Sequence, residues 1–364
     1  MRSVLTAFWA LAVSAGPIFA QEVDLQAVAD TILTETGSPG AAIAVMDADG
    51  FREAVAGVRI AGSEAAIEPG DLWHLGSDTK AMTATLAARL VERGEIDWDA
   101  TISQALGDQG FEIAPEFQDA RLVDLLSHRS GLASSIGLFK TLQLVGADAD
   151  RDVVADRRTY AATVLTAKPG GPRGEFLYSN AGYVVAALML ETAGGAPYEA
   201  LMAREVFAPL GMETAGWGPP GEAGAADQPR GHSKGMFGGL KAAEPGAKAD
   251  NPPASNSAGR AHMSFEDLAR FLKAHLDGAA GDESYLSAES WSRLHTPPAG
   301  GSYALGWGAR KSGVLVHSGS NTLWYVVMAI DPNTGVGAMA GVNDGRLDVV
   351  DQPVGDAVRQ FVSF

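Results

Sequence analysis

A serine and a lysine three residues apart are the first residues whose types and spacing suit chemistry. Ser77 and Lys80 lie in the segment Gly76-Ser77-Asp78-Thr79-Lys80, and the apolar repeat that follows predicts a helix from just after Gly76 to Gly94. Residues three apart on a helix lie on one face, one turn from each other. A serine hydroxyl needs a base to take its proton, and a lysine can act as that base when burial or nearby positive charge lowers its pKa. The pair predicts a nucleophile and its activating partner, although Ser and Lys are also typical of an ordinary helix start.

Two further short motifs carry polar groups at the ends of predicted elements. Tyr178 and Asn180 precede a predicted helix, where a phenol can shuttle a proton and an amide can hold a substrate carbonyl. His317 ends a predicted strand, and Gly319 lets a substrate backbone approach closely. Taken singly, these residues are better explained as a helix cap, a packed aromatic and a surface histidine.

The three motifs are more informative together than singly, because their order along the chain and their predicted structural settings follow a known pattern. S-x-x-K, Y-x-N and H-x-G follow one another along the chain, and in this the sequence resembles the penicillin-recognising serine hydrolases. That family includes class C β-lactamases, D-alanyl-D-alanine carboxypeptidases, D-aminopeptidases and related carboxylesterases. The resemblance covers nearly the whole mature chain. Its supporting segments are residues 72–80, 125–132, 258–260, 303–307 and the strand-turn-strand that ends near Asn343.

The resemblance implies the catalytic roles. Ser77 would form the acyl-enzyme, and Lys80 would accept its proton or tune the group that does. Tyr178 would activate Ser77 or the deacylating water, and would protonate the leaving group. The sequence leaves open whether Lys80 or Tyr178 is the general base.

The resemblance also implies the substrate-binding residues. Asn180 would hold Lys80 and the amide carbonyl of the substrate, and Gly319 would leave room beside the strand. The backbone N–H groups of the nucleophile and of Ser320 would form the oxyanion hole. His317 would occupy the position that often meets a substrate carboxylate.

The sequence departs from the family pattern at two places. Many relatives with true β-lactamase activity carry Lys where this chain has His317, which puts efficient β-lactam hydrolysis in doubt. Residues 320–324, Ser-Asn-Thr-Leu-Trp, lack the glycines often found there, which would narrow the pocket.

Elements from both ends of the chain must position these motifs. Strands are predicted at residues 41–46, 51–58, 72–75, 303–307, 314–317, 323–330 and 336–342, and helices at 24–36, 183–191, 198–206, from 264 and over 349–361. This pattern predicts a mixed α/β (α+β) fold in which an antiparallel sheet built from both termini is flanked by helices. The predicted domains are an α/β domain of residues 21–76 and 290–364 and a mainly helical region of residues 77–289. Within the latter, residues 219–257 form a long surface excursion, for which an ordered position over the site is one option.

The start of the chain has the pattern of a secretory signal peptide. Arg2 precedes an apolar stretch at residues 4–15, and the small Ala20 precedes Gln21. Residues 1–20 are therefore predicted to be removed after export to the periplasm or medium. The stretch is too short to span a bilayer, and the absence of cysteine excludes disulfides, thiolate catalysis and a lipobox-type anchor, so no stable membrane anchor is expected.

Composition and motif content narrow the function classes. A net charge of −17 would repel nucleic acids and anionic membranes. The seven histidines are scattered without metal-ligand spacing, and no Walker loop, dinucleotide fingerprint or zinc helix is present, so no metal or cofactor is expected. We expect a serine hydrolase, class C β-lactamase-like, acting on a small-molecule amide, lactam or ester. The alternatives are a carboxylesterase of the same family and a non-catalytic penicillin-binding sensor; the sequence does not determine the oligomeric state.

Overall fold

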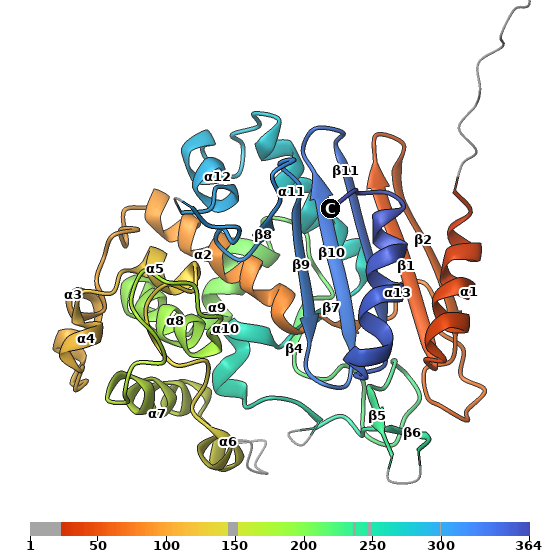
Figure 1. Ribbon diagram of the computed structural model, residues 1–364, viewed down its shortest axis with the longest axis horizontal. Helices are drawn as coiled ribbons and strands as arrows, with labels where there is room; N and C mark the ends of the chain where they lie inside the picture. Colours follow the sequence, from red (N-terminus) through yellow and green to blue (C-terminus); the bar gives the residue numbers. More distant parts are fainter. Residues whose placement is uncertain (1–22, 145–151, 236–237, 247–248, 299) are drawn as a thin grey trace, which may run out of the picture.

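A six-stranded antiparallel sheet built from both ends of the chain is the core of the structure (Figure 1). In this computed structural model residues 23–144, 152–235, 238–246, 249–298 and 300–364 are described; the predicted signal peptide lies outside them. The strand order is β2 (Gly50–Gly57), β1 (Gly40–Asp47), β11 (Val336–Val342), β10 (Tyr325–Asp331), β9 (Leu315–Ser320) and β8 (Gly308–Ala309). Because β1 pairs with β11, the N-terminal hairpin and the C-terminal strands form one sheet. This confirms the predicted fold class.

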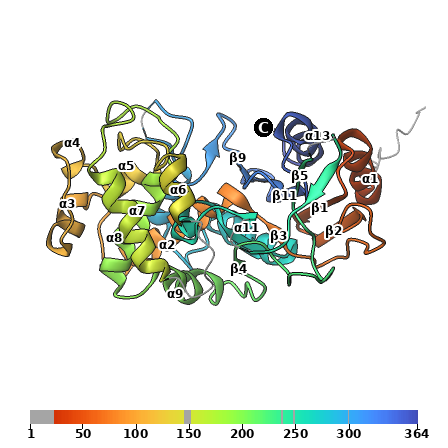
Figure 2. The same ribbon diagram turned by 90° about the horizontal axis from the view of Figure 1, so that it is seen from below.

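Side chains alternate between the two faces of this sheet, as strand geometry requires. On β1, Ile43 and Val45 pack with α1 (Leu25–Thr36) and α13 (Leu347–Arg359), which cover one face. The intervening Ala44 and Met46 face the other side, where α11 (Phe265–Ala279) lies. Figure 2 shows the sheet between these two layers of helix. Both faces of the central strands are therefore buried.

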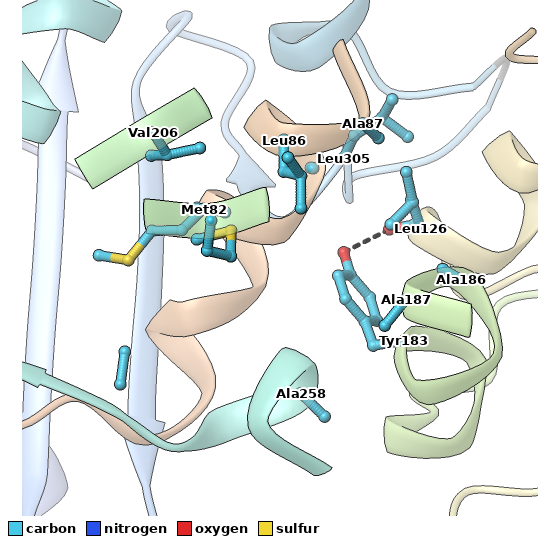
Figure 3. Close-up of a cluster of buried hydrophobic side chains, with 14 of the residues drawn as sticks. Met82, Leu86, Ala87, Leu126, Tyr183, Ala186, Ala187, Val206, Ala258 and Leu305 are labelled. Atoms are coloured by element: carbon cyan, nitrogen blue, oxygen red, sulfur yellow. Dashed lines mark hydrogen bonds between the residues drawn. The ribbon is translucent and has the colours of Figure 1, made fainter. Parts of the chain in front are cut away.

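The helical region packs beside the sheet around α2 (Thr79–Glu92), which follows a turn of 3₁₀ helix, η1 (Gly76–Asp78). Its other helices are α3 (Ile102–Leu106), α4 (Pro115–Gln118), α5 (Leu122–Leu126), α6 (Leu138–Leu144), α7 (Val153–Leu165), α8 (Asn180–Gly194), α9 (Tyr198–Met202), α10 (Asn256–Gly259) and α12 (Ala288–His295). Shorter turns are η2 (Gly107–Gln109), the π-helical turn η3 (Ala203–Phe207) and η5 (Pro253–Ser255). Apolar side chains of α2 and α8 meet in the core (Figure 3). There the buried Tyr183 hydroxyl donates to the carbonyl oxygen of Leu126 over 2.6 Å, which satisfies its polar tip.

Residues 219–257 do not form a simple surface loop. They contain β5 (His232–Lys234) and β6 (Leu240–Ala242), and the buried His232 ring lies 2.8 Å from the carbonyl oxygen of Asn343 at the end of β11. Two other short strands, β3 (Trp73–His74) and β4 (Gly216–Trp217), pair with β7 (Ala261–Met263). Most described residues between 222 and 246 are exposed or half-buried, whereas Arg230 and His232 are buried and hold this stretch against the body of the protein.

The strand predicted at residues 303–307 is wrong in position. Tyr303 makes an isolated bridge with Gly308, and the paired strand β8 begins only at Gly308. Gly306 adopts a φ of 80°, and a Cβ atom there would lie 2.5 Å from the Cα of Ala81. The chain turns at this glycine to pass against α2, while Tyr303 and Trp307 are buried.

Candidate active site

Ser77 lies in η1, where the start of α2 meets the end of β9. The contact is so close that two glycines are required: a Cβ on Gly76 would lie 2.3 Å from the backbone nitrogen of Ser320, and one on Gly319 would lie 2.7 Å from that of Ser77. Gly76 also has a φ of 50°, which favours glycine. Gly319 on β9 therefore leaves room for the turn that carries Ser77. Because of this packing, the backbone nitrogens of Ser77 and Ser320 lie near each other.

Lys80 is fully buried and directed at Ser77. Its Nζ donates to Ser77 Oγ over 3.1 Å and to Asn180 Oδ1 over 2.8 Å, and it also bonds to the carbonyl oxygen of Ala258. Burial lowers the pKa of Lys80 to about 7, against the opposing charge of Asp78. A substantial fraction of the amine is therefore neutral near pH 7 and able to accept a proton.

Tyr178 lies beside Lys80, with its ring centroid 4.8 Å from Lys80 Nζ. Burial raises the pKa of Tyr178, and the influence of the nearby Ser77 side chain only partly offsets this. The phenol is therefore protonated at neutral pH, which suits a proton donor better than a first acceptor.

His317 is buried, and both of its ring nitrogens have hydrogen-bonding neighbours. Nδ1 lies 3.0 Å from Asp78 Oδ1, and Nε2 lies 3.0 Å from the hydroxyl of Tyr303. Burial, and then the charge of Lys80, lower the pKa of His317 to about 3, so the ring is neutral at pH 7. To contact a substrate carboxylate, His317 would have to exchange one of these partners, and it would bring a hydrogen bond without a charge.

Residues of this site line two separate cavities. One of about 200 Å³ is lined by Ser77, Asn180, Ser320 and further polar groups, among them Asn251 and Ser255 from the end of the 219–257 segment. The other, about 490 Å³, lies along the edge of β9. Its lining includes Tyr178, Tyr303, His317, Ser318, Arg310 and Arg359. The first is small and has no charged side chain in its lining, whereas the second is wider and is lined by two arginines and by the carboxylate of Asp351.

Several residues around the site carried no recognised role in the sequence. Asp78 is buried against His317, and burial raises its pKa well above the ordinary value. His128 has a φ of 61°, accepts from the Ser179 N–H over 3.0 Å and packs on Tyr178 with ring centroids 4.3 Å apart. An ionisable residue at the start of an apolar helix, as Asp78 is, could have been recognised from the sequence as a candidate site residue. His128, Tyr178 and Tyr303 are brought together by tertiary packing, and no local sequence pattern predicts that they are neighbours.

Comparison with known proteins gives the family. A sequence model of the beta-lactamase family, described as "Beta-lactamase", matches residues 25–361. Penicillin-binding protein 4 of Amycolatopsis lactamdurans is 29% identical over 334 residues, which are 87% of this chain and 84% of that protein. Unguisins hydrolase ungD of Aspergillus violaceofuscus is 31% identical over 179 residues, 48% of this chain and only 30% of the relative's length.

Solved structures share the fold. The D-amino acid amidase of Ochrobactrum anthropi SV3 with bound L-phenylalanine superposes with a TM-score of 0.73 at 22% identity, over 92% of this chain and 97% of the other. The octameric penicillin-binding protein homologue of Pyrococcus abyssi gives 0.71 at 22% identity, over 92% and 76%. With the family match over nearly the whole described chain, the resemblance seen in the three motifs is confirmed. The chain belongs to the beta-lactamase family of penicillin-recognising serine hydrolases.

Proposed function

We propose that this protein hydrolyses a small amide, lactam or ester through an acyl-enzyme on Ser77. The observation that carries the proposal is the buried Lys80 amine, 3.1 Å from Ser77 Oγ and with its pKa lowered to about 7. Neutral Lys80 takes the Ser77 proton as Oγ attacks the substrate carbonyl. The backbone N–H groups of Ser77 and Ser320 stabilise the oxyanion, and Tyr178 protonates the leaving group as its bond to the acyl carbon breaks. Water then releases the acid and restores the serine.

The two cavities support an assignment of the substrate's two halves. Tyr178 lines the wider cavity, and a proton donor must face the leaving group. Asn180 lines the smaller one, which therefore takes the acyl group. A small, polar, uncharged acyl group fits its hydroxyl and amide lining. The wider cavity is lined by Arg310 and Arg359 but also by Asp351, so its charges do not by themselves select the charge of the leaving group.

Intact-mass spectrometry with a penicillin and with a reactive p-nitrophenyl ester tests this function. An enzyme gives an adduct that forms on Ser77 and is then hydrolysed, while the Ser77→Ala variant stays unmodified. A permanent adduct with both reagents would support the sensor alternative. Turnover of p-nitrophenyl esters but not of nitrocefin or D-alanyl peptides would identify a carboxylesterase.

Export is a further part of the proposal. The signal-peptide pattern of residues 1–20 supports a periplasmic or secreted location. Among the described residues, the helices are all too short or too polar to cross a membrane. N-terminal sequencing of exported protein is expected to begin at Gln21, and material that retains Arg2 would contradict the proposal.

Replacing His317 by lysine tests whether this position meets a substrate carboxylate. The neutral imidazole supplies no charge at pH 8, whereas a lysine would. A charge-assisted hydrogen bond contributes about 1.5–3 kcal/mol. We therefore expect the ratio of kcat/KM for carboxylated over neutral substrates to rise about tenfold or more. His317→Gln, which adds no charge, is the matched control. A ratio that stays flat in folded His317→Lys protein would exclude His317 as a carboxylate contact.

A further inference from the structure

A buried carboxylate outside the catalytic motifs, Asp250, joins several segments of the active site. Its side chain is fully buried and accepts four hydrogen bonds. Oδ2 lies 2.8 Å from His74 Nε2 and 2.9 Å from Arg260 Nε; Oδ1 lies 3.0 Å from Asn321 Nδ2 and 2.8 Å from the Asn251 nitrogen. Burial opposes ionisation, but the contacts with His74, Arg260 and Asn321 outweigh it and hold the pKa of Asp250 below its ordinary value. The group is an anion whose acceptor sites are all in use.

Two of these partners adjoin the proposed oxyanion-hole donors. His74 Nδ1 accepts the N–H of Gly76 over 3.2 Å, one residue before Ser77. Since Nδ1 accepts, the ring proton is on Nε2 and is donated to Asp250. Asn321 follows Ser320 directly, and its side-chain oxygen accepts the backbone N–H of Trp324 over 3.2 Å, closing the turn after β9. Asp250 thus connects the turn that carries one donor to the turn that carries the other.

The third partner of Asp250, Arg260, lies near Ala258, which contacts Lys80. Arg260 follows Ala258, whose carbonyl oxygen accepts from Lys80, and its guanidinium also donates to Asn256 Oδ1 over 2.7 Å. The residue after Asp250, Asn251, lines the smaller cavity. Asp250 itself does not line either cavity of the site, so it has no direct access to substrate.

We propose that Asp250 is a positioning residue for the oxyanion hole, fixing the distance between the Ser77 and Ser320 N–H groups through His74 and Asn321. This inference rests on the proposed function. Oxyanion-hole donors act on charge that develops in the transition state. Loosening them should therefore weaken transition-state binding and leave ground-state binding intact.

The test compares Asp250→Asn with Asp267→Asn. Asp267 is an equally buried carboxylate that accepts from Arg270 and from the Thr214 nitrogen and hydroxyl, both at 2.6 Å, at the start of α11. Three quantities are measured: kcat/KM for p-nitrophenyl acetate, the Ki of phenylboronic acid, whose tetrahedral adduct with a serine places an oxygen in the hole, and the melting temperature. Substrate Kd is measured in the Ser77→Ala background, with and without Asp250→Asn.

For Asp250→Asn we expect kcat/KM to fall and Ki to rise together by about 10- to 100-fold, less than the 10²–10³ for outright loss of a donor. The Kd in the Ser77→Ala background should stay within about threefold. Asp267→Asn should lower the melting temperature but keep kcat/KM and Ki within about twofold.

Two results would overturn the inference while leaving the proposed function intact: unchanged kcat/KM and Ki in Asp250→Asn, or equal losses in both variants. Turnover by Ser77→Ala, or a wild-type protein that does not bind the boronic acid, would instead refute the proposed function. If Asp250→Asn does not fold, Asn321→Ala, which removes one connection only, must show the same paired change in kcat/KM and Ki, and its absence overturns the inference.

Discussion

Replacing Ser77 by alanine is expected to abolish hydrolysis of every substrate that the wild-type protein turns over. The loss in kcat/KM should be roughly four to six orders of magnitude, because the covalent route disappears with its nucleophile. Among the described residues, Ser77 is the hydroxyl that lies within hydrogen-bonding distance of a buried lysine amine. Lys80 and Asn180 would retain their mutual contact in the variant, so the effect is on chemistry rather than on folding.

Steady-state assays with a p-nitrophenyl ester, together with intact-mass spectrometry, measure this effect. Ser135→Ala is the matched control, because Ser135 lines the same small cavity but is exposed and makes no hydrogen bond to Lys80. We expect it to keep activity within about tenfold. A Ser77→Ala protein with activity close to wild type would end the assignment of Ser77 as nucleophile.

The pH dependence of kcat/KM is expected to follow the deprotonation of Lys80. Burial lowers the pKa of this amine to about 7, so the proton-accepting neutral form dominates above pH 7 and is lost below it. Between pH 6 and pH 8 the neutral fraction rises by about tenfold, and kcat/KM should rise with it, since this parameter reports the free enzyme. Tyr178, whose pKa is raised, contributes no limb in this range.

Lys80→Arg is the variant that isolates this effect. A guanidinium stays protonated at all accessible pH values and cannot accept the serine proton. We expect a loss of about three orders of magnitude or more in kcat/KM, and no limb near pH 7. A wild-type profile that is flat between pH 6 and pH 8, with full activity at pH 6, would show that neutral Lys80 is not the base. The ionised form of Tyr178 would then have to be reconsidered.

The local sequence predicts most of the helices and strands, because each depends mainly on residues that are close together in the chain. Apolar residues that recur every four positions after Gly76 predicted α2, and short apolar runs predicted β1, β10 and β11. The strand predicted at residues 303–307 was wrong for a tertiary reason: Trp307 is buried against Phe271 and His275 of α11, and Tyr303 against the rings of Tyr178 and His317, rather than by pairing in a strand.

By itself the sequence determined the contact between Ser77 and Lys80, the proposed nucleophile and base, because they are one helical turn apart and need no distant residue to meet. It also indicated the family through the order of three motifs. Only the tertiary structure decided the protonation states of Lys80 and His317. Burial from several distant elements gives Lys80 its lowered pKa and keeps His317 neutral between Asp78 and Tyr303. The contacts of Asp250 likewise join residues up to 176 positions apart in the chain. Desolvation and long-range hydrogen bonds depend on what surrounds a group in space, and no local pattern of residue types specifies that environment.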